Sequence, residues 1–187
     1  MSRSTLIVVG LVVVALVLTG GTVAVVVFKD RADFVRRLWA ALDAFRDRSG
    51  QPLPLSARWI LLAQAAYETE WGRTAAARGH NYWNLSAGSS WKGPVTPGPD
   101  TEPDGQGGWK NILQAWRAYP DDQAGISDLV DNWLTWPAYR AAKPKLLAGD
   151  RDGYLSELRA GGYFTQDLPT YQAGVLARLE QSRPFIV

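Results

Sequence analysis

The N-terminal part of the chain is dominated by apolar residues. From Thr5 to Phe28 the sequence has no charged side chain and consists mostly of Val and Leu. A helix of this length crosses a hydrocarbon core of roughly 30 Å. The β-branched runs and the terminal position argue against a buried core helix. A cleaved signal peptide is the closer alternative, but its apolar region is usually only about 7–15 residues long. We therefore expect a transmembrane anchor over residues 1–30 and one domain over residues 31–187.

Two segments with helical periodicity follow this apolar stretch. Residues 30–48 place Phe34, Leu38, Leu42 and Phe45 at helical spacing among charged residues, which predicts an amphipathic helix. Residues 57–71 are apolar on nearly all sides. A helix of this kind is buried on every face, so we expect it to be the central helix of the domain.

The pattern changes after residue 79. Residues 79–108 are rich in Gly, Pro, Ser, Asp and Trp and show no helical period, which predicts loops and a short hairpin. Further helices are expected over residues 121–136, 139–148, 152–160 and 168–181. The predicted fold class is mainly α, with two lobes and a small β-hairpin flap.

Composition restricts the chemistry that the domain can perform. The 20 Lys and Arg residues nearly balance the 18 Asp and Glu residues, which argues against a nucleic-acid partner. There is no cysteine, and His80 is the single histidine, so no metal site and no cofactor are expected. Carboxylates remain as the candidate catalytic groups. Nine Trp and seven Tyr residues exceed what a small core needs, and exposed aromatic rings suit sugar binding.

Glu68 lies toward the end of the predicted central helix. A carboxyl group that is desolvated there has a raised pKa, as a general acid requires near neutral pH. Glu70 lies on another face of the same helix and is expected to be a solvated surface residue. In the flap, Asp100, Glu102 and Asp104 occupy a polar loop, where a carboxylate stays ionised. On composition alone, a structural role for Glu68 is equally open.

Five segments, in order, resemble the glucosaminidase family of peptidoglycan hydrolases, glycoside hydrolase family 73. They are Leu62-Ala63-Gln64-Ala65-Ala66-Tyr67-Glu68-Thr69-Glu70-Trp71-Gly72, Asn81-Tyr82-Trp83-Asn84-Leu85, Trp91 to Thr96 followed by Thr101-Glu102, Trp116-Arg117-Ala118-Tyr119-Pro120, and the closing helices around residues 132–139 and 161–171. The resemblance covers residues 33–182.

This resemblance implies a lysozyme-like fold and a cleft between an α lobe and the flap. It matches Glu68 to the general acid, Glu102 to the flap carboxylate and Tyr171 to a tyrosine that lines the cleft. Glu70 departs from the family pattern, which commonly has a small residue there. The flap is also longer, over residues 97–108. Asp100 and Asp104 therefore stay open as alternatives to Glu102.

The expected reaction is hydrolysis of β-1,4 bonds in the glycan strands of peptidoglycan. A lytic transglycosylase or muramidase on the same fold and a non-catalytic wall-binding module are the alternatives. For contacts with the sugar we expect Trp91 and Tyr119, with Tyr82, Trp83 and Asn81 behind them, and we assign Trp133 and Trp136 to the core.

The expected location is a membrane, with the domain facing the cell wall. The charges disagree with this orientation, because four basic residues follow the apolar stretch and only Arg3 precedes it. A wall hydrolase must reach the wall, so we favour the outward orientation. In a phage-encoded lysis or virion enzyme, the charge distribution would be a weaker argument against the outward orientation.

Overall fold

The computed structural model describes residues 6–9, 12–15 and 21–186, with side chains for residues 31–101 and 104–186. In place of a continuous helix over Thr5–Phe28, it has two short antiparallel strands, β1 (Leu6–Val9) and β2 (Val12–Ala15). Their β-branched residues favour extended backbone. The rest of the predicted span up to residue 20 lies outside the described residues. Within the described part, no helix has the length and apolar character needed to span a bilayer.

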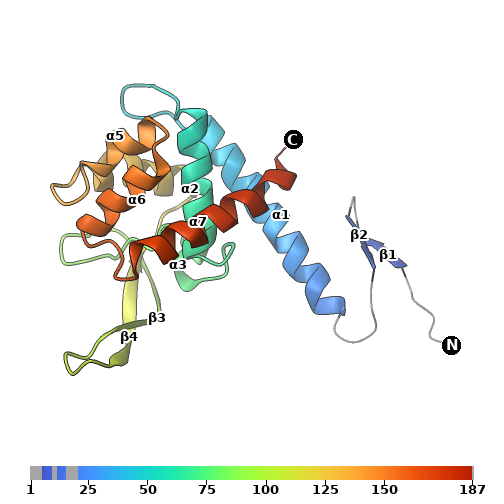
Figure 1. Cartoon of the computed structure of the whole chain (residues 1–187), viewed down its shortest axis with the longest axis horizontal. Coiled ribbons are helices and arrows are strands. Elements are labelled where there is room, and N and C mark those ends of the chain that lie inside the picture. The colour runs from blue at the N-terminus through green and yellow to red at the C-terminus, as the bar shows by residue number, and fades with distance from the viewer. Residues whose placement is uncertain (1–5, 10–11, 16–20, 187) are drawn as a thin grey trace.

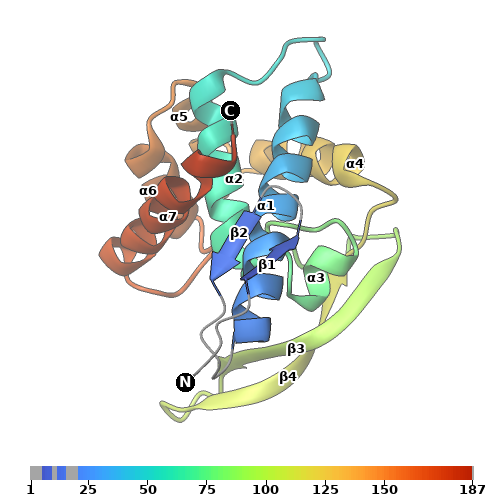
Figure 2. The same cartoon turned by 90° about the vertical axis from the view of Figure 1, so that its right-hand side faces the viewer.

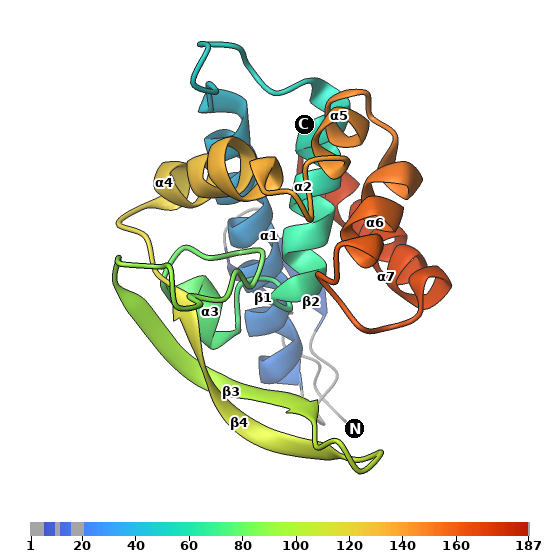
Figure 3. The same ribbon diagram turned by 90° about the vertical axis from the view of Figure 1, so that its left-hand side faces the viewer.

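The first long helices build the core. Helix α1 (Gly21–Ala44) leads into the domain, and α2 (Leu55–Glu68) crosses its centre. In Figure 3, α1 and α4 lie on one side of α2, and α5, α6 and α7 lie on the other. The buried side chains of α2 include Ile60, Leu61 and Leu62. The predicted central helix is therefore confirmed, although it ends three residues earlier than the sequence pattern suggests.

A group of C-terminal helices covers the other side of α2. It contains α5 (Ala142–Leu147), α6 (Arg151–Ala160) and α7 (Leu168–Ser182), and the 3₁₀ turn η3 (Arg183–Phe185) follows. Figure 1 shows α7 crossing in front of α2. The two helices meet closely at Gly174, where an added Cβ would lie 2.2 Å from the ring of Tyr67. A side chain at residue 174 would therefore push α7 away from α2.

The flap is an antiparallel hairpin of β3 (Val95–Pro103) and β4 (Trp109–Arg117). Figure 2 shows it extending below the helices beside α3 (Ala75–Arg78). Gly98 lets the hairpin approach that helix, because a Cβ there would lie 2.4 Å from the Cβ of Ala75. An isolated bridge between Ser86 and Trp116 joins the base of the hairpin to the loop after α3.

A buried ion pair ties this hairpin base to the helical lobe. Helix α4 (Asp122–Ser127) continues into a π-helical turn, η1 (Asp128–Asn132), and a 3₁₀ turn, η2 (Trp133–Thr135). Asp128 Oδ2 accepts hydrogen bonds from Arg117 Nη1 and from Tyr119 Oη, each at 2.7 Å. Arg117 and Asp128 are only 3% and 8% exposed, so each charge depends on the other for compensation.

The described residues thus form a mainly helical domain with a small two-stranded flap, as the sequence predicts. The boundary between anchor and domain at residue 30 stays a prediction.

We expect Asp128→Ala to lower the free energy of unfolding by about 3–5 kcal/mol, because it leaves the Arg117 guanidinium buried without a counter-charge. Urea denaturation of the purified domain measures this loss. Asp152→Ala, which breaks an exposed pair with Arg151, is the control and should cost no more than about 1 kcal/mol. Equal losses in the two variants would contradict the structural role of the buried pair.

Candidate active site

Helix α2 ends at Glu68 in an unusual turn. The three residues Glu70, Trp71 and Gly72 have φ of 48°, 66° and 81°, in the left-handed region. This backbone is costly for residues other than glycine. Thr69 holds the turn, because its Oγ1 donates to Ala65 O at 2.6 Å and accepts from Gly72 N at 2.9 Å. The chain thereby leaves the helix abruptly, directly after Glu68.

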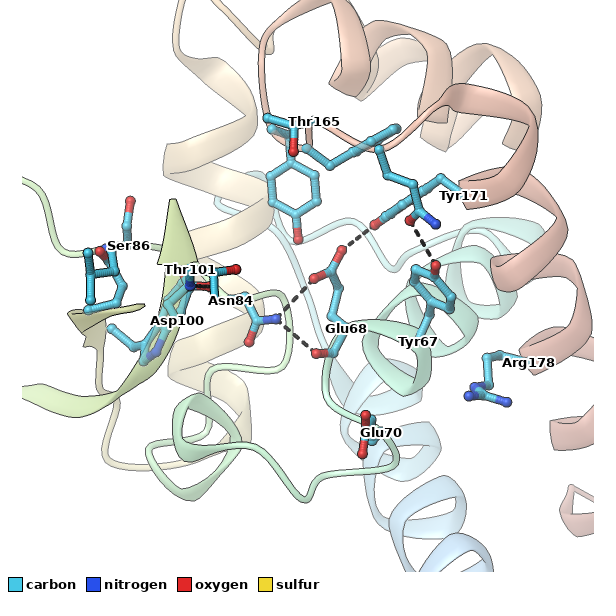
Figure 4. A pocket seen from close by; sticks show the side chains of 16 residues that line it. Tyr67, Glu68, Glu70, Asn84, Ser86, Asp100, Thr101, Thr165, Tyr171 and Arg178 are labelled. Carbon is cyan, nitrogen blue, oxygen red and sulfur yellow. Dashed lines mark hydrogen bonds between the residues drawn. The ribbon is translucent and has the colours of Figure 1, made fainter. Parts of the chain in front are cut away.

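The carboxyl group of Glu68 is held from two sides (Figure 4). Tyr171, on α7, donates its phenolic hydrogen to Oε1. Asn84, in the loop after α3, donates from Nδ2 to Oε2 at 3.0 Å and to the Glu68 carbonyl at 2.8 Å. Asn84 itself adopts a left-handed φ of 47°, a conformation that asparagine tolerates better than most residues. The position of the carboxyl group, which α2 carries, is therefore fixed by α7 and by the loop after α3.

A buried chain of hydrogen bonds supports Tyr171. Gln64, one turn before Glu68 on α2, donates from Nε2 to Tyr171 Oη at 3.4 Å. Its Oε1 accepts from Tyr154 Oη, on α6, at 2.8 Å. The Tyr171 ring also stacks on Phe164, with ring centroids 3.7 Å apart. These contacts orient the Tyr171 hydroxyl toward Glu68.

Burial raises the pKa of Glu68 above its ordinary value, although hydrogen bonds from Tyr171, Asn84 and Tyr163 oppose the rise. The same burial, with the nearby Glu68 charge, raises the pKa of Tyr171 well above that of a free tyrosine. Both groups therefore favour their protonated forms. A protonated carboxyl group that reaches a cavity is suited to give its proton to a bound ligand.

Glu68 lines an open cavity of about 700 Å³ between the two lobes. The hairpin forms one wall, with Asp100, Ile112, Gln114 and Trp116. The segment from Tyr163 to Tyr171 forms the facing wall, and the end of α2 lies between them (Figure 4). Its volume is large enough for a short stretch of a polymer that extends to either side of Glu68.

Of the three predicted flap carboxylates, one is placed at this cavity by the described side chains. Asp100 lines it. Glu102 lies on β3 opposite Lys110 in the strand register, and its side chain lies outside the described part of the structure. Asp104 is exposed at the tip of the hairpin, where its carboxylate accepts from Gln106 N and Gly108 N. These backbone hydrogen bonds lower its pKa.

The prediction for Glu70 needs correction. Because α2 ends at Glu68, Glu70 does not lie on another face of that helix. It is exposed in the left-handed turn and lines the same cavity as Glu68.

Several aromatic residues expected at the substrate lie in the core instead. Asn81, Tyr82 and Trp83 are at most 1% exposed, so they cannot contact a sugar in this structure. Their polar atoms bind protein groups: Asn81 Nδ2 donates to Leu85 O and Arg117 O, Tyr82 Oη to Asp122, and Trp83 Nε1 to Leu61 O.

Tyr119 and Trp91 also have structural contacts. Tyr119 is 8% exposed and donates to Asp128. Trp91 packs its ring over the Arg117 guanidinium at 4.8 Å and its Nε1 donates to Pro94 O at 2.9 Å. Neither residue lines the cavity that contains Glu68. Trp133 lies in the core as predicted, whereas Trp136 is 39% exposed and is no core residue.

Sequence reasoning missed several residues of the cavity, above all Asn84, Tyr163 and Trp116. Asn84 has one recognisable signal, because an asparagine in a loop is a frequent left-handed residue. The local sequence gives no such signal for Tyr163 and Trp116, because their approach to Glu68 depends on how distant segments pack. No group of three or more potential metal ligands exists among the described residues.

Comparisons with known proteins agree with this geometry. Residues 53–183 match the sequence model of the Glucosaminidase family, described as mannosyl-glycoprotein endo-beta-N-acetylglucosaminidase. The peptidoglycan hydrolase FlgJ of Salmonella typhimurium is 34% identical over 95 residues, which are 48% of this chain and 28% of that protein. The chain thus spans well under half the length of this relative.

Solved structures resemble the fold. A C-terminally truncated glycoside hydrolase domain of FlgJ from Salmonella typhimurium aligns with a TM-score of 0.56 and 26% identity, covering 82% of this chain and 98% of that one. The peptidoglycan hydrolase of Sphingomonas sp. A1 aligns with a TM-score of 0.54 and 26% identity, covering 85% and 91%. Because the family match extends over most of the sequence and the fold agrees with it, this chain belongs to the Glucosaminidase family.

Proposed function

We propose that this chain hydrolyses β-1,4 glycosidic bonds in the glycan strands of peptidoglycan, with Glu68 as the general acid. The observation that carries the proposal is the Glu68 carboxyl group, which is held by Tyr171 and Asn84 at the wall of an open cavity. Membership of the Glucosaminidase family and the similarity to a peptidoglycan hydrolase support the reaction and the substrate.

In the proposed mechanism, Glu68 gives its proton to the leaving glycosidic oxygen as the bond breaks. Burial raises the pKa of Glu68, which favours the protonated form that a general acid needs before the substrate binds. Tyr171 and Asn84 hold the side chain in one orientation. Their hydrogen bonds also stabilise the carboxylate that forms once the proton has left.

We propose that Glu102 supplies the second carboxylate, which activates water or stabilises the positively charged transition state. Residues two apart on a strand share a face of the sheet, and Asp100, two residues before Glu102, lines the cavity. The position of Glu102 on β3 is therefore compatible with this role.

We further propose that the apolar stretch from Thr5 to Phe28 attaches the domain to a membrane, with the cavity facing the cell wall. The absence of charge over this stretch supports the proposal. Inside a bilayer a helix satisfies its own backbone hydrogen bonds, whereas a two-stranded hairpin has open edges.

Glu68→Gln should lower wall-digesting activity by about 10²–10⁴-fold, because the amide keeps the size of the side chain but has no proton to transfer. Release of soluble muropeptides, analysed by mass spectrometry, measures the loss. The matched control is Glu180→Gln on α7, whose exposed carboxylate pairs with Arg183 at the surface. Equal activity in both variants would contradict the assignment. Anhydro sugar ends in the wild-type products would identify a transglycosylase instead.

The same variant separates a catalytic role from a structural one. A raised pKa in the folded state means that ionising Glu68 costs folding free energy. The contribution of the protonated carboxyl group to folding stability is fully present below the pKa of glutamate in the unfolded chain, about 4.3. It is lost as pH rises through the raised pKa of the folded state. Glu68→Gln should therefore melt no lower than wild type at pH 8, and any gain should vanish near pH 4. A large loss of stability at pH 8 would favour a structural carboxylate.

Glu102→Gln should reduce turnover strongly and leave the melting temperature unchanged, because residue 102 lies on a hairpin outside the helical core. Asp100→Asn is the matched control on the same strand and should have a smaller effect. Steady-state kinetics on purified peptidoglycan compares the two variants. The reverse order of severity would transfer the role to Asp100.

Deletion of residues 1–28 should move the protein from the membrane pellet to the supernatant after ultracentrifugation, with activity retained, because the cavity is built from later residues. The full chain should resist extraction by high salt and dissolve in detergent. Release of the full chain by salt alone would refute the anchor.

A further inference from the structure

A second cavity opens beside the first. Its volume is about 350 Å³, within the range that holds one small molecule. The two cavities share Asn84, Ser86 and Tyr163 in their linings, so the second begins next to the residue that binds Glu68. A chain that lies across Glu68 can therefore continue into the second cavity.

One wall of this second cavity is aromatic. Trp136 is 39% exposed, which is unusual for so large an apolar side chain. The Arg117 guanidinium lies 5.0 Å from its ring centroid and 4.8 Å from that of Trp91, so it is held between two rings. Arg117 is itself fixed by Asp128 and by Ser86 O, to which its Nε donates at 3.1 Å. The Trp136 ring is thus oriented before any ligand binds.

Another part of the lining is polar but uncharged. Ser86, Ser89 and Ser90 are exposed, and their hydroxyl groups have no hydrogen-bond partner among the described residues. Arg117 is the one charged residue in the lining, and its charge is compensated by Asp128. An aromatic ring and free hydroxyl groups in the same lining suit the apolar face and the hydroxyl groups of a sugar. The absence of a free charge disfavours a peptide that carries carboxylates.

We propose that the cavity lined by Trp136 and the loop from Ser86 to Ser90 is a subsite for an uncharged N-acetylated sugar ring of the glycan strand. Trp136 stacks on the ring, and the serine hydroxyls bind its polar edge. The subsite extends the cavity of Glu68 and rests on the proposed function. Trp136 thereby makes the enzyme prefer long strands over short ones.

The test measures binding, so it does not depend on turnover. The full chain carries Glu68→Gln, and calorimetry records its affinity for β-1,4-linked N-acetylglucosamine oligomers from the disaccharide to the hexasaccharide. Adding Trp136→Ala should weaken binding of the hexasaccharide about fivefold to tenfold, the order expected for one lost aromatic contact, and leave the disaccharide unchanged. Trp136→Phe keeps a ring and should restore part of the affinity.

Trp109→Ala is the matched control. Trp109 is 62% exposed on β4 and lines neither of the two cavities, so its removal should leave affinity unchanged at every length. Unchanged affinity of Trp136→Ala for the hexasaccharide would overturn the subsite. So would an effect seen only with strands that retain their peptide stems, which would assign the cavity to the peptide. Absence of hydrolysis by the wild type, with the length-dependent binding intact, would instead refute the proposed function alone.

Discussion

The burial of most of α2 among the other helices is the constraint on which the rest of the domain depends. A helix with no polar face must be surrounded, and here α1, α5 and α7 all pack against it. Gly174 permits the close approach of α7. The last turn of α2 reaches the cavity, because the chain leaves the helix there through three left-handed residues. The carboxyl group of Glu68 is consequently presented at the junction of the lobes.

The polar groups around this junction divide into two networks. The first, formed by Tyr171, Asn84 and Gln64, holds the Glu68 carboxyl group. The second, centred on Arg117 and Asp128, joins the hairpin base to η1 and orients two tryptophan rings. One network contains the proposed acid, and the other fixes the base of the hairpin that faces it. In both, the polar atoms are satisfied by protein atoms from distant parts of the sequence.

The sequence predicts those features that depend on local pattern. The apolar period identified the central helix, and the position of Glu68 near its end indicated a desolvated acid. The exact end of α2 was not predictable, since Glu70 and Trp71 adopt backbone conformations that their side chains disfavour and that packing imposes. Tyr171 lines the cavity as expected, but the exposure of the other aromatic residues was not predictable for a related reason. The composition gives the number of aromatic residues but not which of them face solvent. Tyr82 and Trp83 are buried, whereas Trp136 is partly exposed and its ring packs on the Arg117 guanidinium.

The hairpin is fastened at one end. Its base is fixed by the bridge from Ser86 to Trp116 and by the close approach of Gly98 to Ala75, while its turn between β3 and β4 lies far from the helices (Figure 2). It is therefore an arm attached at one end only. Each added cross-strand pair of residues lengthens this wall of the cavity by about 3.4 Å without contact with the core. A change in the length of this arm would therefore deepen or shorten the cavity while the contacts of Glu68 stay the same.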